Sequence, residues 1–222
     1  MKGTFRDVSG PLAKFGVTVI DEAVTDEFRR ELLDVLRSAD SVPAVVVSSN
    51  RSSDITDDAV IAPEVDAAVR RTRQLTVGRL VDDRLDAYFA SVTPEVATVS
   101  RRAVATAESA SCLRYGPGDY FVAHRDSPVG AGTREVDRRL VSVVLFLNGH
   151  TDHAGDSSPT GDAEPTFTGG ELVVVPVEDF VDLGVAVEPV PGRLVLFPST
   201  MVHEVKPVLS GDRFTVVTWY HA

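Results

Sequence analysis

The chain has 222 residues, enough for one substantial hydrophobic core, and its 33 acidic against 22 basic side chains give a formal net charge of −11. Nucleic-acid binding draws its affinity from clustered Lys and Arg, so this charge argues against a nucleic-acid partner. A single cysteine, Cys112, excludes an internal disulfide, and no apolar run approaches the ~20 residues of a membrane span. We expect one cytoplasmic domain over residues 1–222, with no membrane partner and with its oligomeric state open.

The first 110 residues mix strand and helix patterns. The run "FGVTVIDEAV" has the β-branched character of a strand, and Thr25 is placed to cap a helix whose apolar face carries Phe28 and Leu36. A second strand is predicted at "AVVVSS", and Pro63 is a good first residue for another helix. A further helix is predicted through "GRLVDDRLDAYFASV", with an apolar stripe of Leu80, Val81, Leu85, Tyr88 and Phe89. We expect residues 1–110 to form a helix-rich support region.

From Ser111 onward, short strand-like runs alternate with Gly, Pro and Asp. They read "SCLRYG", "RLVSVVLFLN", "GELVVVP", "AVEPV", "RLVLFPS", "HEVKPV" and "RFTVVTWYH". Many short strands separated by turns predict a sandwich or barrel. We therefore predict a mainly β fold with N-terminal helices, in which residues 111–222 form a jelly-roll core buttressed by helices. Cys112 is expected to be a small core residue rather than a nucleophile.

The segment 149–168 is the one long stretch of this half without a strand pattern. It is rich in Gly, Ser, Asp and Pro, and such a loop is either a lid over a site or a disordered insertion. Its "HTDH" run places His150 and His153 at a spacing that metals use. We expect these histidines to be ordinary solvent-exposed loop residues.

Two side chains with metal-binding chemistry stand two positions apart in "AHRDSP". If the strand "YFVAHRD" continues through them, His124 and Asp126 project to the same face. A third donor is available from another strand, because His203 lies in "FPSTMVHEVKPV", 77 positions after Asp126. Two imidazoles and one carboxylate leave coordination positions open, which suits non-haem Fe(II) that activates O2. The alternative is a coincidence of surface strand residues.

Arg213 strengthens this otherwise common pattern. It stands ten residues after His203, placed to return on the next strand toward the same cavity. A guanidinium offers a fixed fork of donors and suits a carboxylate, here the remote one of 2-oxoglutarate (2OG). The charged run "GTREVDRR" is either a solvated face or a recognition element for an acidic or amino-acid substrate.

Taken together, these residues resemble a known family. The runs "RYGPGDYFVAHRD", "VLFLN", "GGEL", "PGRLVLFPS", "HEVKPV" and "RFTVVTWYH" follow one another between Cys112 and His221. In this order they resemble the prolyl-hydroxylase branch of the Fe(II)/2OG-dependent dioxygenases, which includes oxygen-sensing prolyl hydroxylases and small prolyl 4-hydroxylases. The resemblance implies a double-stranded β-helix (jelly-roll, cupin-like) core, with Fe(II), 2OG and O2 as cofactor and cosubstrates.

The resemblance also assigns roles to matching positions. The three donors become iron ligands, and Arg213 becomes the partner of the 2OG C5 carboxylate. Thr215, on the same strand face, adds a hydroxyl there. Tyr115 is implied to face the cosubstrate or substrate, and Trp219 to line the cavity wall. For Tyr115, Thr215 and Trp219 the alternative is plain strand packing.

Two departures from the family pattern make the substrate pocket more apolar. Phe146 stands in "LFLN" where the oxygen-sensing enzymes have a tyrosine that bonds the C5 carboxylate. Phe121 stands three residues before His124, where the family often has a tyrosine. Asp126 favours oxygenation over halogenation, because the related halogenases have a small residue at that position.

The predicted function is hydroxylation of an unactivated C–H bond of a prolyl residue, a free amino acid or a small metabolite. An oxygenase with a non-hydroxylating outcome on a natural-product intermediate is one alternative. The other is a non-catalytic metal- or ligand-binding jelly roll, against which the complete donor set and Arg213 argue.

Overall fold

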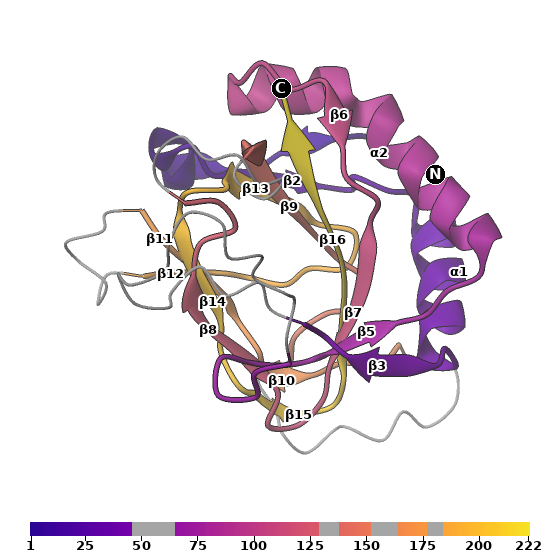
Figure 1. Ribbon diagram of the computed structural model, residues 1–222. Coiled ribbons are helices and arrows are strands. Elements are labelled where there is room, and N and C mark those ends of the chain that lie inside the picture. The colour runs from indigo at the N-terminus through magenta and orange to yellow at the C-terminus, as the bar shows by residue number, and fades with distance from the viewer. Residues whose placement is uncertain (46–64, 129–137, 152–163, 177–183) are drawn as a thin grey trace, which may run out of the picture.

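The computed structural model describes residues 1–45, 65–128, 138–151, 164–176 and 184–222. Two main sheets face one another, and two α-helices lie against the side of the larger sheet that faces away from the smaller one (Figure 1). The larger sheet has the strand order β1 (Arg6–Asp7), β2 (Thr18–Asp21), β13 (Leu194–Pro198), β9 (Val141–Phe146), β16 (Arg213–His221), β7 (Ser111–Tyr115), β5 (Arg73–Leu75) and β3 (Ser41–Pro43), with β6 (Thr106–Ala107) beside β16.

The smaller sheet carries part of the candidate site. Its strand order is β12 (Val185–Val187), β11 (Leu172–Val175), β14 (Val202–Val205), β8 (Tyr120–His124) and β4 (Arg70–Arg71). A separate pair joins β10 (Thr168–Gly169) and β15 (Val208–Ser210). These sheets and helices confirm the predicted mainly β fold with N-terminal helices.

The central strands of the larger sheet are buried on both faces. Every residue of β9 is buried, and its side chains alternate between two apolar clusters. Val143 and Leu145 pack toward the helices, whereas Val144 and Phe146 pack between the two sheets. Burial on both faces explains why "VSVVLF" is apolar except at Ser142, and the alternation directs one face of β9 and β16 into the space where the candidate site lies.

The two helices cover the outer face of the larger sheet. Helix α1 (Asp26–Arg37) begins where predicted, with the Thr25 side chain accepting a hydrogen bond from the Phe28 amide. Helix α2 (Arg79–Ser100) runs longer than predicted and buries Leu85, Tyr88, Phe89, Val92 and Val96. The inclusion of Leu80 in the buried stripe is wrong: its side chain is 74% exposed, because its position in the helical turn points away from that face.

Other sequence expectations for the first half need correction. Strand β2 is shorter than the predicted run, and residues 65–69 lead into β4 instead of continuing a helix from Pro63, which itself lies outside the described residues. Most of the predicted strand "AVVVSS" also lies outside them. Strands β1 to β6 come from residues 1–110, so this half supplies strands as well as helices. Among the described residues, no helix is both long and apolar enough to cross a membrane.

Candidate functional site

The structure brings the three predicted metal donors together. His124 ends β8 and pairs with His203 of β14, and Asp126 follows two residues after β8. The Nε2 atom of His124 lies 3.6 Å from Asp126 Oδ1, and that of His203 lies 3.5 Å from Asp126 Oδ2. All three donor atoms lie within 4.8 Å of one another. This spacing is compatible with one shared cation.

A β-bulge in β8 orients His124. His203 stands opposite His124 and Val205 stands opposite Phe121, so two residues of β8 face one residue of β14. The extra residue breaks the strand alternation and brings Phe121 and His124 to the same face. Their rings stack with centroids 3.5 Å apart. Phe121, predicted to line the substrate pocket, therefore packs on a metal donor.

Asp126 reaches the cluster by a route that differs from the prediction. We expected strand alternation to align it with His124, but β8 ends at His124. The amides of Asp126 and Ser127 instead both donate to the Ser199 carbonyl, at 3.0 and 2.9 Å. These bonds turn the chain away from the smaller sheet and hold the carboxylate against the end of β13.

Backbone carbonyls select the tautomer of both histidines. The Nδ1 atom of His124 lies 2.8 Å from the Val122 carbonyl, and that of His203 lies 3.1 Å from the Met201 carbonyl. A carbonyl only accepts, so each Nδ1 carries the proton and each Nε2 lone pair is left for a metal. Burial, followed by the charge of His124, lowers the pKa of His203 to about 4, so its imidazole is neutral at pH 7.

The Asp126 carboxylate remains ionised. Its Oδ2 atom accepts a 2.6 Å hydrogen bond from Ser142 Oγ, which lies 3.0 Å from Ser199 Oγ. Burial opposes ionisation, but at low pH the charges of His203 and His124, together with the Ser142 hydroxyl, outweigh it and hold the pKa of Asp126 well below its usual range. Two imidazole nitrogens and one carboxylate oxygen, all facing one point, fit Fe(II).

Arg213, the predicted carboxylate partner, lies on the same inner side of the larger sheet. It is the first residue of β16, stands opposite Tyr115 and is 2% exposed. Its guanidinium lies 5.0 Å from the ring centroids of Tyr115 and Phe146, and its Nη1 atom lies 3.4 Å from Thr215 Oγ1. These contacts join Arg213, Tyr115 and Thr215, the three residues predicted for the cosubstrate, and add Phe146, which was predicted for the substrate pocket.

The charge of Arg213 is not neutralised by the described residues. They offer no carboxylate in ion-pair contact with it, and its Nε atom is buried without a hydrogen-bond partner. Burial lowers the pKa of Arg213 to about 10, so the group is still protonated at neutral pH. Glu171 favours the charged form from beyond ion-pair contact, but a buried cation without a counter-ion in contact is costly, and a carboxylate of a bound ligand would reduce that cost. The site therefore fits the remote carboxylate of 2OG.

Trp219, predicted to line the cavity wall, lies on β16 near the predicted metal donors. It stands opposite Ser142, the residue that binds Asp126. The Arg139 guanidinium lies 3.7 Å from the Trp219 ring centroid and is fixed by two 2.6 Å hydrogen bonds to Glu108. Arg139 belongs to the charged run "GTREVDRR", expected to be either a solvated face or a recognition element, of which residues 132–137 lie outside the described residues.

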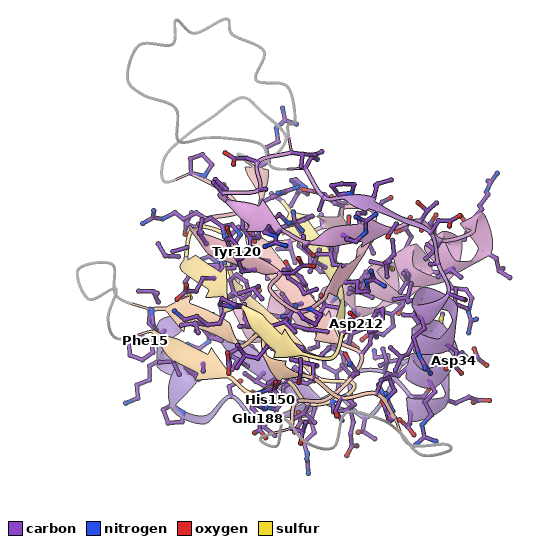
Figure 2. The ribbon with its side chains drawn as sticks, turned by 90° about the horizontal axis from the view of Figure 1, so that it is seen from below. Phe15, Asp34, Tyr120, His150, Glu188 and Asp212 are labelled. Carbon is purple, nitrogen blue, oxygen red and sulfur yellow. The ribbon has the colours of Figure 1, made fainter. Side chains whose placement is uncertain are left out.

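The remaining candidates lie apart from the donors. His150 packs edge-on against Phe167, and its amide donates to the Pro189 carbonyl, which agrees with its position beside Glu188 in Figure 2. His153 and most of segment 149–168 lie outside the described residues. Cys112 is buried in the core beneath the helices, where burial raises the pKa of its thiol to about 12. This environment fits the expected core residue.

Three further residues were not predicted from the sequence. Ser142 and Asn148 are buried polar side chains within and just after β9, and a polar residue in the apolar run "RLVSVVLFLN" is the signal that would have found them. Arg70 of β4 lies with its guanidinium 4.7 Å from the Phe121 ring centroid. Nothing in the sequence pattern indicated that contact.

Comparison with known proteins gives concordant results. A PKHD-type hydroxylase of Crocosphaera subtropica is 28% identical over 93% of this chain and 78% of its own length. One from Shewanella sp. (strain ANA-3) is 33% identical, but the match covers only 48% of this chain and 39% of that relative. This chain thus aligns with well under half of the Shewanella relative and with most of the Crocosphaera one.

Solved structures share the fold. A Pseudomonas putida prolyl-4-hydroxylase aligns with a TM-score of 0.60 at 21% identity, covering 96% of both chains. A Trichoplax adhaerens prolyl hydroxylase, solved with a hypoxia inducible factor peptide fragment, aligns with a TM-score of 0.61 at 20% identity, covering 96% of this chain and 87% of that one. The expected double-stranded β-helix is thereby confirmed. The sequence profile of the 2OG-Fe(II) oxygenase superfamily matches residues 110–221, half of the chain, and the chain belongs to that superfamily.

Proposed function

We propose that this oxygenase uses Fe(II), 2OG and O2 to hydroxylate an unactivated C–H bond of a prolyl residue. The observation that carries the proposal is the buried guanidinium of Arg213, which faces the space between the sheets, as the metal donors do, and has no carboxylate partner among the described residues. The names of the relatives support hydroxylation as the outcome, since both sequence relatives are hydroxylases.

Each side chain of the site has a defined task in this proposal. His124, Asp126 and His203 would hold Fe(II), with Ser142 fixing the carboxylate. When bound, the iron together with 2OG and O2 supplies the oxidising power that breaks the C–H bond, and succinate and CO2 are the coproducts. Arg213 and Thr215 would bind the C5 carboxylate of 2OG and so orient the cosubstrate.

The aromatic side chains keep this region dry. Tyr115 and Phe146 flank the guanidinium of Arg213, and Phe121 covers His124. Water exclusion strengthens the pairing between Arg213 and a carboxylate, because the local dielectric falls. Phe146 has no hydroxyl to offer the carboxylate, so Arg213 and Thr215 carry that contact in this proposal.

A second substrate class is favoured by Arg70. Its guanidinium lies over Phe121, which stacks on His124, and its Nε atom is buried without a partner among the described residues. This cation would pair with the carboxylate of a free amino acid or small metabolite. Succinate release measured over a library of prolyl peptides and free amino acids separates the two classes, and Arg70→Ala should weaken turnover only of substrates with that carboxylate.

The central test is binding of the two cofactors. Anaerobic titration with Fe(II) and then 2OG should produce the weak visible charge-transfer band of the chelate. Arg213→Ala should bind Fe(II) normally and lower the affinity for 2OG at least about 30-fold, because truncating a buried charge partner costs roughly 2–5 kcal/mol. Metal binding with no 2OG-dependent band would instead support a non-catalytic binding protein.

We also propose a cytoplasmic location, which the lone, buried thiol Cys112 supports.

A further inference from the structure

A buried amide lies directly behind Arg213. Asn148 follows β9 by two residues and is fully buried. Its Oδ1 atom accepts a 2.9 Å hydrogen bond from the Phe214 amide, and its Nδ2 atom donates a 2.8 Å bond to the Asp212 carbonyl. Asp212, labelled in Figure 2, immediately precedes Arg213. The Asn148 side chain thus forms hydrogen bonds with the peptide groups on both sides of Arg213.

The Asn148 side chain supplies hydrogen bonds where the backbone pairing between β9 and β16 has ended. Backbone pairing between β9 and β16 begins at Phe146 and Thr215, one residue beyond Phe214. The Leu147 amide donates to the Phe214 carbonyl at 3.1 Å, but the Phe214 amide finds its acceptor in the Asn148 side chain. A side-chain amide offers a donor and an acceptor on one rigid plane, so it can satisfy both peptide groups at once.

Asn148 is itself held from two directions. Its Nδ2 atom also donates to the Pro165 carbonyl at 3.1 Å, where the segment after β9 returns to the sheet. Next to it, Arg29 of α1 donates to the Leu147 carbonyl at 2.7 Å and pairs with Glu164. A fully bonded, buried network of this kind fixes one geometry, because every alternative leaves a polar group unsatisfied.

We infer that Asn148 is the positioning residue of Arg213. By fixing the Asp212 carbonyl and the Phe214 amide, it sets the backbone dihedrals of Arg213 and so the direction in which the guanidinium leaves the strand. That direction matters because the guanidinium has few polar restraints of its own: beside the rings of Tyr115 and Phe146, Nη1 makes one long contact to Thr215, and Nε makes no hydrogen bond among the described residues. The inference rests on the proposed function, in which Arg213 binds the C5 carboxylate of 2OG.

The experiment compares two 2-oxo acids that differ only at the far end. Calorimetric titrations into the Mn(II)-loaded protein use 2OG and 2-oxopentanoate, in which a methyl group replaces the C5 carboxylate. Asn148→Ala should lower the affinity for 2OG by roughly 5–30-fold, the range covered by one or two lost hydrogen bonds, and leave that for 2-oxopentanoate within about twofold. Asn148→Leu, similar in size and uncharged, loses the acceptor for the Phe214 amide and both donors; it should show the same selective loss and serves if the Ala variant does not fold.

Two further variants define the outcome. Tyr220→Phe removes a different buried hydrogen bond of β16, to the Phe89 carbonyl on the helix side, and should change neither affinity. In an Arg213→Ala background, Asn148→Ala should have no further effect on 2OG. Equal losses for both acids, additive losses with Arg213→Ala, or no loss would overturn the inference. If Arg213→Ala itself leaves 2OG affinity unchanged, the proposed cosubstrate site fails and the inference falls with it.

Discussion

Ser142 shows how one hydroxyl supports the carboxylate of a proposed metal site. It lies in a strand whose other residues are apolar, is 1% exposed, and donates to Asp126 at 2.6 Å. This bond fixes the carboxylate rotamer and favours its ionised form. The same hydroxyl lies within hydrogen-bond distance of Ser199 Oγ, so its own direction is set as well.

Ser142→Ala should therefore weaken metal binding about 10–100-fold without removing any ligand, as loss of such outer partners typically does. Competition of the protein with a chromophoric chelator for Mn(II) measures this. Ser199→Ala is the control, because Ser199 Oγ reaches Asp126 only through Ser142, and its effect should be smaller. Equal affinities of wild type and Ser142→Ala would show that the backbone bonds at Asp126 alone hold the carboxylate.

At this scale the sequence identified the side chains that the structure brings together as candidate ligands, but not the residues that support them. The spacing of His203 and Arg213 was sufficient to select both, because the chemistry of iron and of a carboxylate restricts which residue types serve. Ser142 and Asn148 act through other residues, and many polar side chains would look equally plausible for such a task. Phe146 was assigned to the substrate pocket, yet its ring borders Arg213.

At the scale of elements, side chains that pack closely against a pair of glycines shape the space around Arg213. Gly169 and Gly170, of the "GGEL" run, both have positive φ, +67° and +65°. A Cβ built on Gly170 would lie 2.8 Å from Val208 Cγ2 and 3.2 Å from Arg213 Cδ. Glycine is therefore required twice at position 170, for its backbone conformation and for the space it leaves to the arginine.

Gly170→Ala should lower the free energy of unfolding by roughly 1–3 kcal/mol, since it adds left-handed strain to a steric contact. It should also reduce the affinity for 2OG more than that for Mn(II), because the displaced atom belongs to Arg213. Chemical denaturation and calorimetry provide the two measurements. Gly78→Ser is the control, since nothing lies within 4 Å of an added Cβ there and φ is negative. A fully stable variant with normal 2OG affinity would contradict this reading of the contact.

The bulge in β8 marks the limit of prediction for elements. Period-two alternation correctly indicated strands, but it would place Phe121 and His124 on opposite faces. One extra residue against β14 reverses this, and register between distant strands is decided by pairing that no local pattern records.

At the scale of the whole molecule, an ion pair links the first strands to the core. Asp21 of β2 accepts hydrogen bonds from Arg193, beside β13, at 2.7 and 3.2 Å, and these bonds lower the pKa of its carboxyl below the ordinary 3.8. Because the folded pKa is the lower one, the stabilisation is fully present above the unfolded value and disappears as pH falls through the folded one.

Asp21→Asn should therefore cost roughly 1–3 kcal/mol of unfolding free energy at pH 7, as expected for a lost charge-assisted hydrogen bond. The difference from wild type should shrink steadily below about pH 4, where the unfolded carboxyl is already protonated. Urea denaturation at a series of pH values tests this. A difference that stays constant down to pH 2 would show that geometry, and not charge, is what the substitution removes.

The attachment of Asp126 to the larger sheet has a consequence for how firmly the two sheets are held together. Both histidines belong to the smaller sheet, whereas Asp126 is attached through Ser142 and Ser199 to β9 and the end of β13 in the larger one. A cation bound by His124, His203 and Asp126 would connect the two sheets, which otherwise contact each other largely through apolar packing. At a free metal concentration 100 times the dissociation constant, the folded state gains about 2.7 kcal/mol. Much of that gain should appear as slower hydrogen exchange in β8 and β14, so chelation would loosen the smaller sheet before the larger one.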